Sequence, residues 1–176
     1  MPQPIIIADH DPQWRTRFDQ LASTIAATLG PLHQRIEHVG STSVDGLAAK
    51  PIIDFDVVIA SFDLLPEVIA ALAPLGYEHE GERGIPGRHS FRRADASVPH
   101  DGSGRSWPRH SLYVCATDSR ELARHTWFRD YLRAHPEAVA EYARLKRELA
   151  ARYPHDIDAY CEGKSEFVED ILGRRV

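Results

Sequence analysis

The chain has 176 residues, of which 43% are hydrophobic and 27% charged, which is the composition of a globular protein with a sizeable core. The formal net charge is −5, so no global basic field would attract nucleic acid, and a nucleic-acid partner is not expected. No run approaches the length of a membrane span, the N-terminus lacks a secretory signal, and the two cysteines have no metal-like spacing. We therefore expect a reduced, cytoplasmic protein with no membrane partner and a single domain over residues 1–176.

The first half of the chain predicts alternating strands and helices. A short strand is expected at residues 5–8, followed by a helix in "DHDPQWRTRFDQLASTIAATLGP", which Asp11 can cap and Gly30 ends. The apolar residues of this helix recur every three or four positions and predict one buried stripe: Trp14, Phe18, Leu21, Ile25 and Leu29. A strand in "HQRIEHVG", a loop or short helix in "STSVDGLAAK", a strand in "PIIDFDVVI" and a helix over residues 64–75 follow.

The second half begins with strands and ends with helices. Three strand-length pieces, "YEHEG", "RHSFRRA" and "HSLYVCA", are separated by loops rich in Gly and Pro. From residue 118 onward the pattern is helical, in "SRELARHTWFRDYLRAH", "PEAVAEYARLKRELAARY" and "DIDAYCEGKSEFVEDILGRR". This order predicts an α+β fold, in which a small mixed sheet is flanked by helices and the helices of residues 118–176 pack on it.

Two carboxylates stand inside the apolar strand "PIIDFDVVI". Asp54 and Asp56 are two residues apart, so both point to the same face of a strand. Burying a carboxylate among Ile and Val is costly unless something pairs with it. Because Mg²⁺ is typically held by one or two carboxylates together with phosphate oxygens and water, the pair predicts a site for Mg²⁺ or Mn²⁺. The alternative is a solvated strand edge, which the flanking apolar residues fit poorly.

The segment before this strand can hold phosphate. Gly40 lets a backbone approach a ligand closely, and the amides and hydroxyls of Ser41, Thr42 and Ser43 can donate to phosphate oxygens. Lys50 adds a cation ten residues after Gly40. A Gly-Ser pair alone is a common turn. Followed by the carboxylate pair, it predicts a phosphate cradle next to a metal site.

Gly-Ser followed by Asp-Phe-Asp resembles the signature of the nucleotidyltransferase superfamily. The longer stretch "IEHVGSTSVDGLAAKPIIDFDVVI" resembles the GrpB-like family of predicted nucleotidyltransferases. The resemblance extends over nearly the whole chain, through "DHDPQW", "LGYEHEGERGIPGRHSF", "FRDYLRAHPEAVAEYARLKREL" and "GKSEFVEDIL". It implies a nucleotidyltransferase-like fold, with Gly40 and Ser41 at the triphosphate turn and Asp54 and Asp56 at the metal pair.

The chain departs from the family and superfamily patterns at the last strand. GrpB-like sequences tend to carry "HHLHV" where this chain has "RHSLYV", so His110 is kept while Ser111 and Tyr113 replace histidines. Active superfamily members usually present a third carboxylate from a later strand, and "RHSLYVCA" contains none. The candidate substitutes are Glu37, Glu78, Glu80, Glu82, Asp95 and Asp101. The departure bears on catalysis more than on nucleotide binding.

Two further side chains are candidates for the site. His110, on the last strand, could face Asp54 and Asp56 as a ligand or general base. Lys164, in "GKSEF", could reach a nucleotide phosphate or could interact with a helix end by its charge.

The sequence thus predicts a metal-dependent nucleotidyltransferase, which transfers a nucleotidyl group from a nucleoside triphosphate to a hydroxyl of an unknown small-molecule acceptor. The alternative is a non-catalytic module of the same fold that binds a nucleotide or a coenzyme A-like ligand. The resemblance supports this alternative, because relatives of the family occur fused to dephospho-CoA kinase. A metal-dependent phosphohydrolase is the third hypothesis. A third carboxylate within reach of Asp54 and Asp56 would favour an enzyme.

Overall fold

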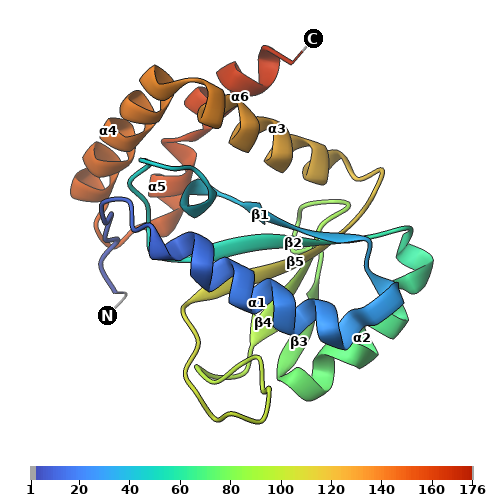
Figure 1. Cartoon of the computed structure of the whole chain (residues 1–176). Helices are drawn as coiled ribbons and strands as arrows, with labels where there is room; N and C mark the ends of the chain where they lie inside the picture. Colours follow the sequence, from blue (N-terminus) through green and yellow to red (C-terminus); the bar gives the residue numbers. More distant parts are fainter. Residues whose placement is uncertain (1–2, 176) are drawn as a thin grey trace.

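A five-stranded mixed sheet, in the order β1-β2-β5-β4-β3, runs through the middle of the protein (Figure 1). The computed structural model describes residues 3–175 of the chain. The strands are β1 (Arg35–Val39), β2 (Ile53–Ile59), β3 (Tyr77–Gly81), β4 (His89–Arg93) and β5 (His110–Ala116). β2 and β5 pair in parallel, and the other neighbours pair antiparallel. The predicted α+β class is confirmed.

Within residues 3–175, six α-helices and four short 3-10 turns accompany the sheet. The helices are α1 (Gln13–Leu29), α2 (Leu65–Leu72), α3 (Arg120–Ala134), α4 (Pro136–Arg152), α5 (Ile157–Glu162) and α6 (Ser165–Gly173). The 3-10 turns are η1 (Gly30–Leu32), η2 (Ser41–Ser43), η3 (Phe62–Leu64) and η4 (Ala73–Leu75). The helix predicted over residues 64–75 is α2 with a 3-10 turn at each end. The strand predicted at residues 5–8 is wrong, because only Ala8 forms a bridge, to Ala49.

One face of the sheet is covered by α1 and α2 and holds the main core (Figure 1). The predicted stripe of α1 is buried along its whole length. It belongs to the same apolar cluster as the alternate β2 residues Ile53, Phe55, Val57 and Ile59. Each of these β2 side chains is at most 1% exposed. Because strand side chains alternate, Asp54 and Asp56 point to the opposite face.

The opposite face lies under α3 to α6, which gather on the far side of the sheet from α1 and α2 (Figure 1). Its apolar contacts are fewer: Val58 and Cys115 of the sheet meet Leu122 of α3. A separate cluster joins α4 and α6 to the segment after η2 through Val44, Leu47, Tyr142 and Ile171. No helix within residues 3–175 is both long enough and apolar enough to cross a bilayer.

Candidate functional site

Gly40 brings the backbone of the η2 turn against Asp54. Its φ of 70° lies in the left-handed region, where glycine is favoured. A Cβ added at Gly40 would lie 2.7 Å from Oδ2 of Asp54, so the close approach needs a residue without a side chain. β1, which leads into the turn, pairs with β2, and this pairing sets Val39 opposite Asp54. The predicted adjacency of the Gly-Ser turn and the first aspartate is present.

A cavity of about 310 Å³ opens at this point, between the sheet and the C-terminal helices. Gly40, Ser41, Thr42 and Asp54 line it from one side, and the wall residues from the rest of the chain are Ala49, Lys50, Ile52, Ser111, Tyr113, Phe128, Tyr142, Lys146, Tyr160 and Lys164. Burial raises the pKa of Asp54 to about 6, and a hydrogen bond from Ser111 acts in the opposite direction. We call this space the turn cavity.

Three lysines converge on the turn cavity. Lys50 and Lys164 were predicted from the sequence, and both lie over the ring of Tyr160, with Nζ 5.6 and 4.4 Å from its centroid. Lys146 of α4 completes the set: it is only 2% exposed and donates to Oγ of Ser41 over 2.8 Å. Burial, and then the charge of Lys164, lower the pKa of Lys146 to about 7. None of the ion pairs found within residues 3–175 involves these lysines, so their charge is free to meet an anion.

Asp56 does not line the turn cavity and is held by a side chain of α3. Its side chain is fully buried, and its Oδ2 accepts a hydrogen bond from Nδ1 of His125 over 2.7 Å. The other oxygen, Oδ1, is buried without a hydrogen-bond partner. A buried carboxylate oxygen of this kind calls for a further positive group.

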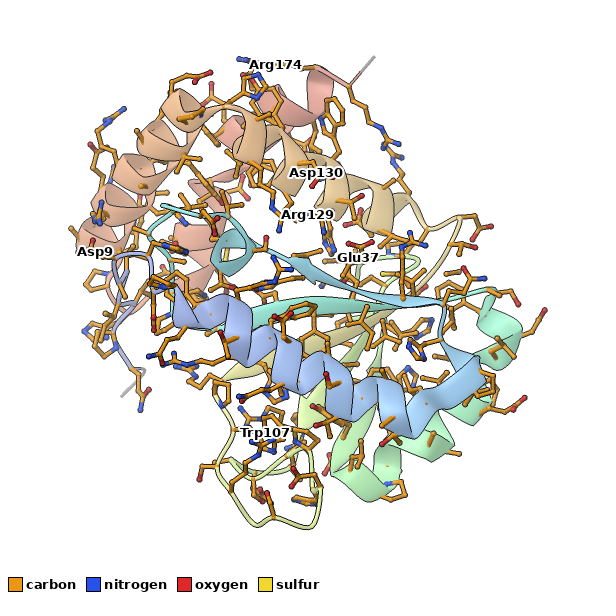
Figure 2. All side chains as sticks on the ribbon, viewed as in Figure 1. Asp9, Glu37, Trp107, Arg129, Asp130 and Arg174 are labelled. Carbon is orange, nitrogen blue, oxygen red and sulfur yellow. The ribbon has the colours of Figure 1, made fainter. Side chains whose placement is uncertain are left out.

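The nearest candidate for a third carboxylate, Glu37, is already engaged. The register of β1 and β2 places it directly opposite Asp56, on the same face of the sheet. Arg129 of α3 donates to Glu37 Oε2 over 2.7 Å, and Arg35 donates to its other oxygen. Figure 2 shows Arg129 reaching from α3 toward Glu37. These arginines hold the pKa of Glu37 low against its partial burial.

The β5 residue that pairs with Asp56 in the parallel register is Tyr113, and β5 contains no carboxylate. Across residues 3–175, no group of three His, Cys, Asp or Glu side chains is arranged to hold a metal ion. The chain therefore offers two carboxylates to a cation. They suit Mg²⁺, since both share one face, Asp54 lines the turn cavity, and Oδ1 of the buried Asp56 lacks a partner.

His110 is not part of this constellation, and its predicted place beside the aspartates is wrong. The parallel register pairs His110 with Ile53, one residue from Asp54, so its side chain points to the opposite face. There its Nδ1 donates to the carbonyl of Pro108, and its Nε2 accepts from the hydroxyl of Tyr77 over 2.7 Å. Burial lowers its pKa to about 4. His110 is a core histidine with both ring nitrogens paired.

The η2 turn divides the predicted phosphate-binding residues. Ser41 and Thr42 line the turn cavity, and Thr42 is fixed by a 3.0 Å hydrogen bond to Nε2 of His38. Ser43 does not line this cavity: its hydroxyl donates to the carbonyl of Gly40, and its own carbonyl accepts from Arg133. Ser43 therefore stabilises the turn from outside the turn cavity.

Two residues of the site were missed in the sequence, although a signal for each is present. Lys146 lies four residues after buried Tyr142 and three before Leu149, on the apolar stripe of α4. His125 likewise lies between Leu122 and Leu132 on the buried side of α3. A charged or titratable residue within an apolar helical stripe indicates a polar partner across the interface.

The chain resembles proteins of one family along its whole length. The profile of the family described as GrpB protein matches residues 4–174. The Glutamate-rich protein GrpB of Alkalihalophilus pseudofirmus is 32% identical over 96% of this chain and 94% of its own length, and the UPF0157 protein YqkA of Bacillus subtilis is 35% identical over 91% and 44%. A dephospho-CoA kinase of Mycolicibacterium paratuberculosis is 27% identical over 97% of this chain and 46% of its own length. The chain spans about half of the last two relatives.

Solved structures agree on the fold. The conserved protein GrpB from Enterococcus faecalis superposes with a TM-score of 0.82 and 32% identity, covering 96% of this chain and 95% of that one. The Cid1 poly(U) polymerase bound to MgGTP superposes with a TM-score of 0.56 and 16% identity, over 83% of this chain and 45% of that one. The second likeness shows a nucleotidyltransferase-like fold.

Proposed function

The chain belongs to the GrpB family, and we propose that it is a metal-dependent nucleotidyltransferase, which binds a nucleoside triphosphate in the turn cavity and transfers its nucleotidyl group to a hydroxyl of a small acceptor. One observation carries the proposal. Asp54, the Gly-Ser turn and three lysines without acid partners meet in one cavity of about 310 Å³. A polyphosphate with its counter-cation matches this arrangement of charges.

Each wall of the cavity has a part in holding the nucleotide. Ser41 and Thr42 of the turn donate to phosphate oxygens. Lys50, Lys146 and Lys164 neutralise the triphosphate, with Lys146 next to Ser41. Phe128 supplies aromatic surface on which a base can stack, since the rings of Tyr142 and Tyr160 are already covered by Phe167 and by the lysines. The cavity is too small for an entire nucleotide and its acceptor, so the acceptor enters from outside it.

The reaction is an in-line displacement at the α-phosphate. The acceptor oxygen forms a bond to the α-phosphorus, the bond from that phosphorus to the bridging oxygen breaks, and pyrophosphate leaves. The hydroxyl proton passes to water. Asp54 and Asp56 would hold Mg²⁺ or Mn²⁺, which when bound neutralises the charge that develops on the phosphate oxygens. The lysines stabilise the departing pyrophosphate, and His125 fixes the orientation of Asp56.

The test is a thermal-shift titration of the four nucleoside triphosphates with and without Mg²⁺ or Mn²⁺. Occupancy at about 100 times Kd adds roughly 2.7 kcal/mol of apparent stability. The double change Asp54→Asn and Asp56→Asn should fold and should lose the metal-dependent part of this stabilisation. Glu67→Gln, an exposed acid on α2, is the matched control and should keep it. Equal metal-dependent binding by the double variant and the wild type would refute the proposal.

One observation favours a second function, a non-catalytic binding module. β5 presents Tyr113 and Ser111 where a third carboxylate would stand, so the site has the charge to bind phosphates without the three acids of an active superfamily member. The dephospho-CoA kinase relative suggests a coenzyme A-like ligand. Two measurements distinguish the enzyme from the binding module. One is calorimetry with dephospho-CoA, and the other is pyrophosphate release from each nucleoside triphosphate in the presence of hydroxyl-bearing metabolites. Tight binding without pyrophosphate release would select the binding module.

A further inference from the structure

A second cavity, of about 440 Å³, lies on the other side of the η2 turn. Its walls come from the segment before α1, from α1, from β1 with the turn that follows it, and from the junction of α3 and α4. The lining residues are His10, Arg15, His38, Thr42, Ser43, Asp45, Gly46, Leu132, Arg133, Pro136 and Val139. Only Thr42 is shared with the turn cavity, so the two spaces are separated by the turn itself. We call this second space the rear cavity.

Positive charge dominates the rear cavity. Arg15 and Arg133 stand in its walls, and their charges act together on His38. Their own carboxylate partners lie outside: Arg15 pairs with exposed Asp19 over 3.3 Å, and Arg133 comes within 3.7 Å of exposed Asp130. The one carboxylate residue in the lining, Asp45, has a fully exposed side chain and contacts His10 over 3.7 Å.

The N-terminal end of α4 adds to the positive electrostatic potential of the rear cavity. The helix has 17 residues and begins at Pro136, which lines the rear cavity, and no side chain caps its first turn. The N-terminal end of a helix carries a partial positive charge and free N–H groups that favour an anion. Arg133 lies three residues before this start, so its guanidinium and the helix end act on the same space.

His38 supplies a buried polar atom that has no partner. The residue is only 6% exposed, lines the rear cavity, and is packed flat against Phe18 with ring centroids 4.4 Å apart. Its Nε2 is bonded to Thr42, whereas Nδ1 has no hydrogen-bond partner. Burial, and then the charge of Arg133, lower the pKa of His38 to about 3, so the ring is neutral. When Nε2 accepts from the Thr42 hydroxyl, Nδ1 carries the ring proton and can donate to an anion beside the two arginines.

The rest of the lining is apolar. Leu132, Pro136 and Val139 form one wall, which offers an uncharged body a place to bury its surface. We propose that the rear cavity is a binding site for a small organic anion, a carboxylate or phosphate monoester with an apolar body, whose charged group meets Arg15 and Arg133. The site does not depend on the function of the turn cavity.

The test uses two probe anions, benzoate and phenyl phosphate, with benzamide as the uncharged analogue. Binding to the whole chain is measured by calorimetry and by NMR shifts of the His38 ring. At least one anion should bind with a Kd of about 1 mM or tighter, and benzamide should not. Arg15→Gln should weaken the anion about tenfold, since it removes one charge-assisted hydrogen bond. Because Arg15 is on the exposed side of α1, this variant should fold.

Two controls locate the site. Arg17→Gln changes an arginine of the same helix that pairs with Asp11 outside the cavity, and it should leave binding unchanged. Lys164→Gln changes the turn cavity and should also leave it unchanged. No binding of either anion at about 10 mM would overturn the proposal. So would binding that Lys164→Gln removes and Arg15→Gln does not, because the anion would then occupy the turn cavity.

Discussion

The two faces of β2 bury side chains of different kinds, apolar on one face and charged on the other. Phe55 and Val57 point toward α1 and α2 into a predominantly apolar core. Asp54 and Asp56, on the same strand, point toward α3 and α4, where the neighbours are His125, Tyr113 and Lys146. The first face buries two neutral histidines: both ring nitrogens of His110 are paired, whereas Nδ1 of His38 has no partner. The second keeps an unpaired carboxylate oxygen and a buried lysine without an acid partner.

This difference separates the stability of the fold from its proposed function. An apolar face contributes free energy to folding in proportion to the area it removes from water. Charges buried without partners oppose folding and persist where a ligand later supplies the partner. The α1 and α2 side therefore holds the sheet together, and the C-terminal helices close a charged site against it.

The largest expected effect comes from comparing two adjacent residues of β2. Phe55→Ala opens a cavity in the core face and should lower the free energy of unfolding by about 3–5 kcal/mol. Asp54→Asn removes a partly buried charge next to a second carboxylate and should leave the ligand-free protein as stable or more stable. Denaturant melts of both variants measure this. A loss of stability in Asp54→Asn as large as in Phe55→Ala would mean that the carboxylate is part of the scaffold.

The second prediction concerns Lys146. Lys146→Met should stabilise the ligand-free protein by about 1–3 kcal/mol, because it removes a cation buried without an acid. The same variant should lose part of the stabilisation that a triphosphate gives. Melts at pH 7 with and without ligand measure both changes. Arg144→Met, on the exposed side of α4, is the control and should change neither.

Lys146 should make the stability of the protein increase with pH. Its pKa of about 7 in the folded protein lies below its ordinary value of 10.5, so between these values the unfolded chain binds more protons. The free energy of unfolding therefore rises as the pH increases from 7 toward 10.5. Below pH 7 the full cost of burying the charged Lys146 applies. The advantage of Lys146→Met over the wild type should accordingly shrink across this range. An advantage that grows with pH would contradict the assignment.

The sequence predicted most of the fold because the hydrophobic periods are strong. The α1 stripe, the five strands and the first two C-terminal helices each follow a local pattern. The third C-terminal segment, predicted as one piece, forms two helices, α5 and α6. Residues 5–8 are apolar but find only the single bridge between Ala8 and Ala49. Pairing of a strand depends on a free partner edge, and composition does not reveal whether one exists.

The candidate site was predictable where it is contiguous in the chain. Gly40, Ser41 and Asp54 come from one local stretch, and its turn and strand bring them together. The residues that arrive from distant elements were not predicted or were assigned wrongly. Lys146 and His125 depend on how α4 and α3 pack, and the face of His110 depends on the register between β2 and β5, which a shift of one residue would reverse.

The smallest expected effect tests that register. His110→Gln breaks the hydrogen bonds to Tyr77 and Pro108 on the core face, and it should cost roughly 1–2 kcal/mol of unfolding free energy. Because His110 faces away from Asp54, the extra stability from triphosphate and Mg²⁺ should match the wild type. His125→Gln, on the charged face, is the matched comparison and should reduce that ligand effect, since Asp56 loses its orienting partner. Titration of both variants by thermal shift compares them. If His110→Gln removed the ligand effect while His125→Gln kept it, the two faces would have been assigned the wrong way round.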